Sequence, residues 1–479
     1  MRQLRVSQRA RSEQPLFPDE DAVTITYATN GLPVAVIGGG PVGLAAAAHL
    51  LYRGVPVKLY EAGQTVGTNV LDWSHVRLFS PWRFNIDAAS RLILSEQGWQ
   101  EPPSDDLPTG RELYDSYLAP LGTILTARAI IETRAHVRSI SRRGIDKIVS
   151  RNRASHLFAL AVNAVSTGER IDLARAVIDA SGTWQNPNPL GASGMPTPGE
   201  REAAPFISYG IPDVLQVDRH QYARKHTLVV GAGHSAATVL IDLARLAEAD
   251  DSTRIIWAVR NQNLMRVFGG GEVDQLPARG KLGSDLRQLI ETRRLRVVTG
   301  FAAERIDRLD NGISVGGNTD AGPVTLGPVD RVIVVTGQRP DLTLTRELRL
   351  DLDPWLESPR ALGPSIDPNV HSCGSVPPHG YRELAHPEPD YFTVGIKSYG
   401  RAPTFLMATG FEQVRSVAAY LADDQAAAED VRLVLPETGV CSASYATTEQ
   451  TLEACCARVA WEQTNTCCAA QAKAPDSAL

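Results

Sequence analysis

The chain has 479 residues, which is too long for a single hydrophobic core and predicts two or three domains. Hydrophobic residues make up 43% and charged residues 21%, as in a globular protein, and the net charge of -6 gives no electrostatic basis for binding nucleic acid. No apolar run approaches the roughly 20 residues that a membrane span requires, so we expect a cytoplasmic protein without a membrane partner.

The N-terminal segment, residues 1–31, carries several arginines and lacks the apolar core of a secretory signal peptide. We expect it to be a flexible tail. A mitochondrial-type targeting peptide is the alternative interpretation.

A glycine motif follows the first apolar run of the chain. Residues 34–37 are apolar and three of them are β-branched. Gly-x-Gly-x-x-Gly follows, and a pattern rich in alanine and leucine predicts a helix directly afterwards. Strand, tight turn and helix in this order are typical of a dinucleotide-binding domain. The first glycine permits the turn, the second leaves room for a pyrophosphate, and the third lets the helix pack against its strand. The predicted pyrophosphate loop comprises Gly38, Gly40, Pro41, Val42 and Gly43.

An acidic residue ends the next predicted strand. Residues 55–60 lead into Glu61, whose carboxylate can accept hydrogen bonds from both ribose hydroxyls and disfavours a 2′-phosphate. Residues 62–85 then mix glycine, aromatic and polar residues without a clean period, which favours a segment that wraps around a large planar cofactor.

The middle of this domain has a helical pattern at 111–128 and strand patterns at 135–140, 157–164 and 170–180. Val137, in the first of these strands, is expected to contact the cofactor. The last strand runs into the small-residue turn Ser181-Gly182, which would let the chain pass beneath the cofactor and leave for another domain. The proline-rich stretch 186–198 is the predicted crossover.

A second glycine motif indicates a second nucleotide domain. Its sequence is Gly231-Ala232-Gly233-His234-Ser235-Ala236, between an apolar strand pattern and a helical one. The residues expected to contact the cofactor are Gly231, Gly233, His234 and Ser235. The following strand ends on Arg260, whose guanidinium can hold a 2′-phosphate, so we predict NADPH rather than NADH. A solvated surface arginine is the alternative. Residues 302–318 predict a hairpin, and 329–335 a strand that enters a return turn containing Gly337.

The C-terminal part of the fold is predicted to place a helix against the flavin. The helix is expected from about Pro403 to Leu421, with its N-terminus directed at the reduced flavin. Lys397, Arg401 and Thr404 are the predicted cofactor contacts here, and a structural salt bridge is the alternative for each of the two basic residues.

The last residues are rich in cysteine, with two adjacent pairs. Vicinal thiols do not fit zinc-finger spacing, but they suit soft thiophilic ions and trivalent metalloids. The alternative is a disordered tail with incidental thiols. Because five of the six cysteines lie in the last 39 residues, a reduced compartment is favoured over a secreted disulfide scaffold. The predicted metal or metalloid ligands are Cys441, Cys455, Cys456, Cys467 and Cys468.

The two glycine loops, Glu61, Ser181-Gly182 and Thr336-Gly337 resemble those of the two-dinucleotide-domain flavoproteins, most closely the flavin-containing class B monooxygenases, over about residues 32–425. The resemblance implies an α/β protein with two Rossmann-like, doubly wound three-layer domains. The implied division is 1–31 tail, 32–190 first part of the FAD domain, 191–328 NADPH domain, 329–430 return part of the FAD domain and 431–479 cysteine-rich tail.

The resemblance also implies a reaction. NADPH, bound at the second loop, reduces FAD, the reduced flavin reacts with O2, and a soft atom of the substrate takes one oxygen, while the protein orients the groups and excludes water. By analogy, Arg77, Trp82 and Asn85 lie near the flavin ring as the catalytic candidates.

Three features depart from the related families. Disulfide reductases have a cysteine pair beside the flavin, in the segment that corresponds to residues 62–85 here. This chain has no cysteine in that segment. The monooxygenase signature Phe-x-Gly-x3-His is degenerate around Phe206 and Gly210, and the usual Gly-Asp near the flavin is replaced by Gly395-Ile396-Lys397.

We therefore predict an FAD- and NADPH-dependent monooxygenase-type enzyme. Trivalent arsenicals are the leading substrate, because arsenic-resistance flavin monooxygenases oxidise them and mercuric reductases carry a C-terminal cysteine pair. The alternatives are N- or S-hydroxylation of a small organic substrate, metal reduction, and a non-catalytic FAD protein that sequesters metal or senses redox state. A homodimer is one open alternative for the assembly.

Overall fold

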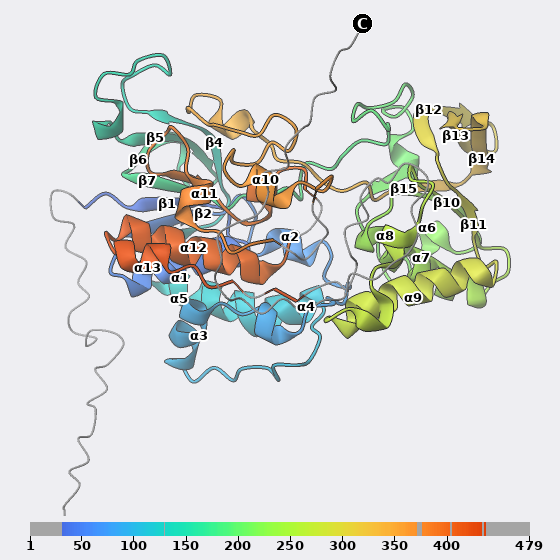
Figure 1. The fold of residues 1–479 in the computed structure, drawn as a ribbon, viewed down its shortest axis with the longest axis horizontal. Coiled ribbons are helices and arrows are strands. Elements are labelled where there is room, and N and C mark those ends of the chain that lie inside the picture. Colours follow the sequence, from blue (N-terminus) through green and yellow to red (C-terminus); the bar gives the residue numbers. More distant parts are fainter. Residues whose placement is uncertain (1–30, 129, 371–375, 403–404, 434, 437–479) are drawn as a thin grey trace, which may run out of the picture. The chain divides into compact units, whose positions relative to one another are not determined.

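Two five-stranded parallel sheets dominate the fold, and each carries one of the glycine motifs at its carboxyl edge (Figure 1). The structure is a computed structural model that describes residues 31–128, 130–370, 376–402, 405–433 and 435–436. The predicted N-terminal tail, except residue 31, and the five C-terminal cysteines lie outside the described residues, as does Thr404.

The first sheet is built from strands of both halves of the chain. All its neighbouring strands are parallel, and Val34 of β1 lies opposite Val57 of β2 and Ala176 of β7. In spatial order the strands are β16 (Tyr391–Thr393), β7 (Ala176–Asp179), β1 (Val34–Ile37), β2 (Val57–Tyr60) and β3 (Ile131–Glu132).

The alternation of side chains along β1 explains the three layers of this domain. Val34 and Val36 are buried among helical residues, whereas Ala35 and Ile37 are buried with a three-stranded antiparallel sheet on the other face. Both faces are covered, so the strand is apolar throughout. The antiparallel sheet consists of β4 (Ala135–Arg142), β5 (Phe158–Ala164) and β6 (Gly168–Ala174). The helices of the chain from residue 31 to 128 are α1 (Pro41–Tyr52), α2 (Thr68–Leu71), α3 (Ala88–Ser95), α4 (Gly110–Leu113) and α5 (Ala119–Ala127).

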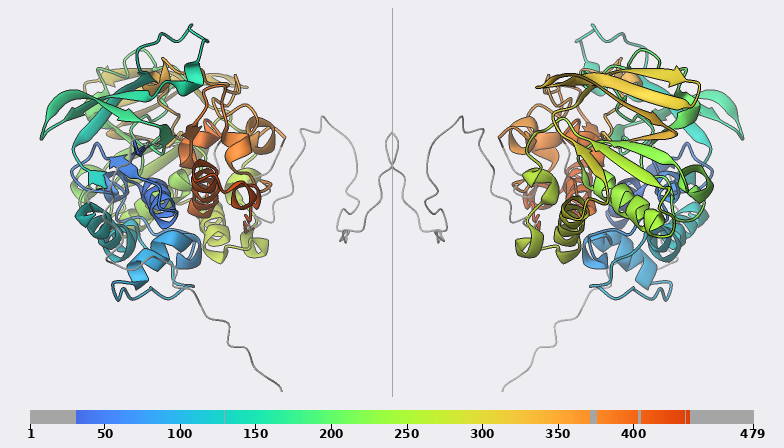
Figure 2. Two further views of the ribbon diagram at one scale, coloured as in Figure 1. Left: turned by 90° about the vertical axis from the view of Figure 1, so that its left-hand side faces the viewer. Right: turned by 90° about the vertical axis from the view of Figure 1, so that its right-hand side faces the viewer.

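The second domain repeats this plan. Its helices α7 and α9 pack with the second parallel sheet in one hydrophobic cluster, and a second antiparallel sheet packs with the other face (Figure 2). The parallel strands, in order, are β11 (Arg296–Val298), β10 (Arg254–Ala258), β9 (His226–Val230), β15 (Arg331–Val334) and β8 (Ile207–Tyr209). The antiparallel strands are β12 (Ala302–Leu309), β13 (Gly312–Thr319) and β14 (Gly322–Val329). The helices are α6 (Arg219–Tyr222), α7 (His234–Glu248), α8 (Met265–Phe268) and α9 (Pro277–Glu291).

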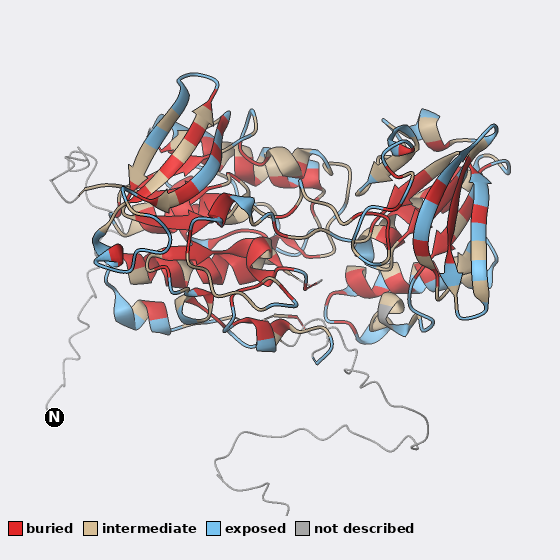
Figure 3. Cartoon of the chain, turned by 90° about the horizontal axis from the view of Figure 1, so that it is seen from above, coloured by how far each residue is buried: buried red, intermediate tan, exposed pale blue. Residues whose placement is uncertain are grey.

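The C-terminal part returns to the first domain. Helix α12 packs beside α1, and both are largely buried. Figure 3 shows that the buried residues gather in the sheets and in the helices beside them. The helices of this part are α10 (Gly363–Ile366), α11 (Tyr381–Leu384), α12 (Met407–Leu421) and α13 (Gln425–Glu429). The predicted α/β fold with two three-layer dinucleotide-binding domains is confirmed.

Several predicted boundaries are wrong. The strand expected at 170–180 is two strands in different sheets, because the chain leaves the antiparallel layer at Arg175 and β7 enters the fully buried parallel sheet. The return to the first domain does not start at residue 329, since β15 pairs with β9 and β8 in the second sheet. Helix α12 starts at Met407 rather than Pro403, with Leu406 in extended conformation before it.

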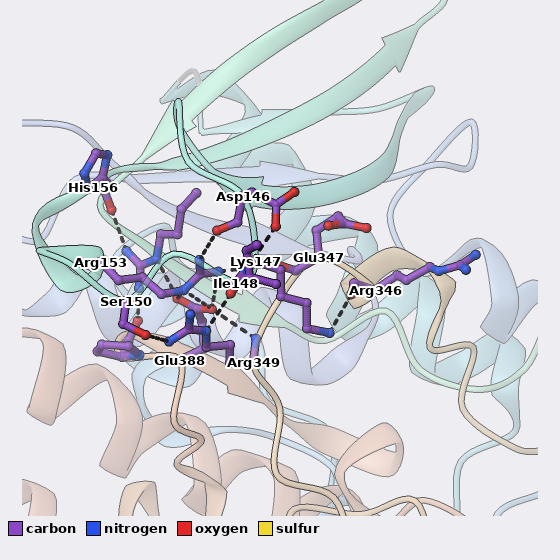
Figure 4. A network of polar contacts seen from close by, with 12 residues as sticks. Asp146, Lys147, Ile148, Ser150, Arg153, His156, Arg346, Glu347, Arg349 and Glu388 are labelled. Carbon is purple, nitrogen blue, oxygen red and sulfur yellow. Dashed lines mark hydrogen bonds and ion pairs between the residues drawn. The ribbon is translucent and has the colours of Figure 1, made fainter.

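A buried network of charges fixes the antiparallel sheet to the returning chain (Figure 4). Glu388 is fully buried and pairs with Arg142 at 2.7 Å and with Arg153 at 2.8 Å, while the backbone N–H of Arg349 donates to its Oε2 atom. Burial by itself would raise the pKa of Glu388, but the bonds from the two guanidinium groups hold it below its usual value. The two ion pairs of Glu388 join segments more than 230 residues apart in the sequence.

Candidate active site

The first glycine loop has the shape that a pyrophosphate requires. Gly38 has φ of 100°, and a Cβ there would lie 2.6 Å from the carbonyl oxygen of Ala180. A Cβ on Gly43 would lie 1.9 Å from the carbonyl oxygen of Gly38. At Gly40, by contrast, a Cβ would meet no atom within 4 Å. The first and third glycines are therefore required by the protein itself, whereas the open side of Gly40 fits a ligand.

Helix α1 adds an electrostatic reason for an anion at this loop. Its N-cap is Gly40, it has Pro41 at the first position, and its first turn contains no acidic residue and no side-chain cap. The N–H groups of its first turn and the helix dipole therefore favour a negatively charged group. The structure thus fits the pyrophosphate of a dinucleotide at Gly40, Val42 and Gly43.

Glu61 is held in place before any ligand binds. The backbone N–H of Gly39 donates to its Oε2 atom and the N–H of Gly63 donates to its Oε1 atom, both at 2.6 Å. Burial raises the pKa of Glu61, and these two hydrogen bonds oppose the rise. Each carboxylate oxygen keeps a further acceptor site, which is what two ribose hydroxyls would need.

The turn Ser181-Gly182 belongs to a buried polar network. Asp179, at the end of β7, is fully buried and accepts hydrogen bonds from the Ser181 hydroxyl at 2.6 Å, from the Lys397 ammonium at 2.7 Å and from the Tyr391 hydroxyl at 3.0 Å. Burial by itself would raise the pKa of Asp179, but the charge and hydrogen bond of Lys397 hold it below its usual value. The network fixes the turn directly beside Gly38.

Both basic residues predicted to contact the cofactor form ion pairs. Lys397 is buried in an ion pair with Asp179 and also donates to the Ser181 hydroxyl at 3.0 Å. The Nε atom of Arg401 lies 2.9 Å from the Oε2 atom of Glu357. The ammonium of Lys397 has three donors and two of them are used in these bonds. A contact between Lys397 and the cofactor stays a prediction.

The second glycine loop repeats the geometry of the first. Gly231 has φ of 141°, and a Cβ there would lie 2.2 Å from the carbonyl oxygen of Val335, whereas Gly233 faces open space. Helix α7 begins at His234, with Gly233 as N-cap and no acidic residue in its first turn. Ser235 lies in that turn, and the ring of His234 lies 5.0 Å from the ring of Phe79.

Arg260 lies two residues beyond β10 and is exposed. Its Nη1 atom donates to the carbonyl oxygen of Ala192 at 3.2 Å, a hydrogen bond that leaves most of its donors facing solvent. The position is suitable for a 2′-phosphate, and a contact between Arg260 and that phosphate stays a prediction.

The two chain segments that connect the domains bind each other. The side-chain amide of Asn188 donates to the carbonyl oxygen of Thr336, and the backbone N–H of Asn188 donates to that of Gly337. The side-chain amide of Asn186 donates to the carbonyl oxygen of Arg339, and the backbone N–H of Arg339 donates to the carbonyl oxygen of Asn186. The return turn with Gly337 therefore lies against the predicted crossover.

The structure separates the three predicted catalytic residues. Arg77 and Trp82 both line an open hollow of about 580 Å³, together with three carboxylates. Asn85 is fully buried, and its amide group is used in two hydrogen bonds of 2.8 Å with Ser80. Val137 packs in the core with Ile37. None of these positions by itself assigns a catalytic role.

Sequence reasoning missed the buried acid Asp179 and the buried pair of Asp274 and Arg279, which is 2.8 Å apart. Asp179 could have been noticed as a carboxylate that ends an apolar strand. Among the described residues, no group of histidine, cysteine, aspartate and glutamate side chains could hold a metal ion, and no helix has the length and apolar character to cross a membrane.

Comparison with solved structures shows the same fold. The bacillithiol disulfide reductase Bdr of Bacillus cereus is 16% identical, with 82% of this chain and 99% of that chain covered and a TM-score of 0.58. DfoA of Erwinia amylovora, a cadaverine monooxygenase of desferrioxamine biosynthesis bound to FAD, is 10% identical, with 88% and 99% covered and a TM-score of 0.57. A mutant flavin monooxygenase from Stenotrophomonas maltophilia is 21% identical, with 81% and 99% covered and a TM-score of 0.51.

No curated protein matches the chain. A family model described as pyridine nucleotide-disulphide oxidoreductase, however, matches residues 32–387, which include both glycine loops. The geometry of both loops agrees with this match, and FAD and NADPH are the cofactors. The chain therefore belongs to the pyridine nucleotide-disulphide oxidoreductase family and is an NADPH-dependent flavin oxidoreductase.

Proposed function

We propose that the protein is a flavin monooxygenase that transfers one atom of O2 to a soft, lone-pair-bearing atom of a small substrate. The observation that carries the proposal is the position of the cysteines: the first is Cys373, so residues 62–85 contain no thiol that could pass electrons from the flavin to a disulfide. With this route absent, O2 is the acceptor we favour. In the balanced reaction NADPH, a proton, O2 and the substrate give NADP+, water and the oxygenated substrate.

The residues of the two loops bind and orient the cofactors in this proposal. Gly40 and Glu61 hold the pyrophosphate and ribose of FAD, and Gly233 and Arg260 hold those of NADPH. FAD, when bound, supplies hydride acceptance from NADPH and the reaction with O2. The protein supplies position and a site without water, so no strong acid or base is needed.

Trivalent arsenicals are the proposed substrates, because arsenic(III) is a soft atom with a lone pair and the C-terminal residues supply five thiols that could bind it. A second candidate is N-hydroxylation of an organic amine, which is supported by the fold shared with DfoA and with the ornithine N-hydroxylase KtzI of Kutzneria. A non-catalytic FAD protein that sequesters metal is the alternative from another class.

The test is NADPH oxidation by the purified, FAD-loaded protein in air, with and without arsenite or methylarsenite. We expect substrate-stimulated turnover with one O2 consumed per NADPH and little hydrogen peroxide. The rate should fall when residues 440–479 are deleted. A full-length variant with all five C-terminal cysteines replaced by serine shows whether a lower rate comes from loss of the thiols or from loss of the chain segment.

Each other result has a defined meaning. Stimulation by amines but not by arsenicals would replace the arsenical by the second candidate. Turnover that persists without O2 and reduces a low-molecular-weight disulfide would overturn the monooxygenase proposal. No NADPH consumption with any substrate would favour the sequestering protein.

A further inference from the structure

A fully buried glutamine ties helix α12 to the turn that follows β16. The turn is the 3-10 helix Gly395–Tyr399, here called the Gly395 turn. The Oε1 atom of Gln413 accepts from the backbone N–H of Gly395 at 2.8 Å, and its Nε2 atom donates to the hydroxyl of Ser398 at 2.9 Å. The same nitrogen donates to the Nε2 atom of His379 at 3.0 Å. One side chain of α12 therefore holds both the turn and a buried histidine.

The orientation of this amide is fixed at both ends. The backbone N–H of Gly395 can only donate, so the oxygen of Gln413 must face it. The Nδ1 atom of His379 lies 3.0 Å from the carbonyl oxygen of Pro377, which can only accept, so Nδ1 carries the hydrogen of the neutral ring. The Nε2 atom is then an acceptor, and it faces the amide nitrogen of Gln413. All these bonds are satisfied together only when His379 is neutral.

A proton on His379 would break this arrangement. It would place a hydrogen on Nε2, opposite an N–H group of Gln413 that lies 3.0 Å away. If the amide turned over to offer its oxygen to the ring, its nitrogen would face the N–H of Gly395 instead. Either arrangement leaves buried donors without an acceptor, which is costly. The bond between Gln413 and the Gly395 turn therefore depends on the protonation state of one ring.

The groups around His379 set when it takes up a proton. Burial lowers the pKa of His379, and the charges of Glu383 in α11 and Glu412 in α12 oppose the shift. Glu412 is itself paired with Arg415 at 2.8 Å, and the ring of Tyr399 lies 5.8 Å from the ring of His379. We expect His379 to be neutral at pH 7.5 and to take up a proton only as the pH falls below about 6.5.

The Gly395 turn is attached to the first glycine loop as well. Gly395 has φ of 69°, and a Cβ there would lie 3.4 Å from the side chain of Val42, in the first turn of α1. Lys397, in the turn, pairs with the buried Asp179 at 2.7 Å, which fixes the neighbouring turn beside Gly38. A shift of the Gly395 turn would therefore move groups that shape the first nucleotide site.

We propose that Gln413 is a positioning residue of the first nucleotide site and that neutral His379 sets its orientation, so that a proton on His379 weakens FAD binding. The proposal rests on the proposed assignment of FAD to the first glycine loop. It does not depend on the substrate or on the reaction of the flavin with O2.

FAD release from the full-length holoenzyme tests the proposal without relying on activity. The FAD-loaded protein is diluted at pH values between 7.5 and 5, and the fluorescence of the released flavin gives the dissociation constant. This constant should rise as the pH falls, by at most about 10-fold for each pH unit, since one proton is involved. His379→Gln keeps an acceptor for Gln413 but has no titratable group, so its dissociation constant should stay nearly level.

Two further variants separate positioning from simple structural damage. Gln413→Glu introduces a carboxylate that can accept from Gly395 and pair with a protonated His379, so FAD binding should no longer weaken as the pH falls. Gln413→Leu removes the bonds altogether and should weaken FAD binding at every pH. His386→Asn, which removes another buried histidine of the same part of the chain, is the matched control and should keep the pH dependence of the parent. Circular dichroism shows whether each variant is folded over the pH range.

The outcomes distinguish the proposal from the assignment on which it rests. Equal FAD affinity of the parent at pH 7.5 and 5, or a parent-like pH dependence in His379→Gln or in Gln413→Glu, would overturn the role of Gln413 and His379. Unchanged FAD affinity in Gly40→Ala would instead refute the assignment of FAD to the first loop, because the open side of Gly40 is where the ligand would lie.

Discussion

The two glycine loops share a positive φ at the first glycine and an open side at the second, and they differ in what lies around them. At the first loop, the acid that would bind ribose is held by two backbone N–H groups, and the neighbouring turn is fixed by the buried Asp179 and Lys397. At the second loop, Arg260 is exposed and makes one hydrogen bond to a carbonyl oxygen. One nucleotide site is preorganised by buried polar groups, and the other presents its charge to solvent.

The difference fits the proposed assignment of FAD to the first loop and of NADPH to the second. A flavin stays bound through many turnovers, so a rigid site costs nothing during each cycle. NADPH must enter and NADP+ must leave every time, which an exposed cation at the edge of the site allows. We therefore expect the stability of the first domain to depend on its buried charged groups. Nucleotide choice in the second domain should depend on the exposed Arg260.

The largest effect is expected from Glu388→Ala in the first domain. The change leaves Arg142 and Arg153 buried without their carboxylate, which should lower the free energy of unfolding by about 3–5 kcal/mol. Urea unfolding measures it. Asp115→Ala, which removes an exposed ion pair of the same domain, should cost less than about 1 kcal/mol and serves as the control.

The glycines of the first loop should separate stability from cofactor binding. Gly43→Ala places a Cβ 1.9 Å from a backbone oxygen and should cost about 3 kcal/mol of stability. Gly40→Ala meets no protein atom, so stability should change by less than about 1 kcal/mol while FAD affinity falls. Equal loss of stability in the two variants would contradict the assignment of Gly40 to the ligand.

Arg260→Ala should act on the choice of nucleotide alone. Loss of charged hydrogen bonds to a 2′-phosphate, worth about 1.5–3 kcal/mol, should reduce the preference in kcat/KM for NADPH over NADH by roughly 10- to 150-fold. Arg254→Ala, at the exposed start of the same strand, is the matched control and should leave the preference unchanged. An unaltered preference in Arg260→Ala would mean that this arginine is only a surface residue.

The smallest effect concerns pH and His386, which lies two residues before Glu388. Burial lowers the pKa of His386 to about 4, so the folded state binds this proton less readily than the unfolded chain does. The contribution of neutral His386 to the free energy of unfolding is therefore complete above about pH 6.5 and is lost as the pH falls towards 4. Melting temperatures between pH 7.5 and 5 should fall less in His386→Asn than in the parent. Parallel pH profiles would contradict this.

The local features of both nucleotide sites can be predicted from the order of residues alone. The glycine spacing, the acid of the first site, the arginine of the second and the strand and helix around each loop follow from contacts within about 30 residues, where the pattern of residue types reflects the geometry directly. The three-layer α/β plan followed from the same repeated pattern.

The contacts between residues far apart in the sequence, by contrast, depend on the whole fold. From the sequence, Lys397 is predicted to bind the cofactor. In the fold, its Nζ atom lies 2.7 Å from the Oδ2 atom of Asp179, which is 218 residues away in the sequence. In the same way, strand β15 joins the second sheet, Glu388 meets two arginines, and Arg279 reaches Pro436. No local period or propensity encodes such partners, because a buried charge is placed by the fold that surrounds it rather than by its neighbours in sequence.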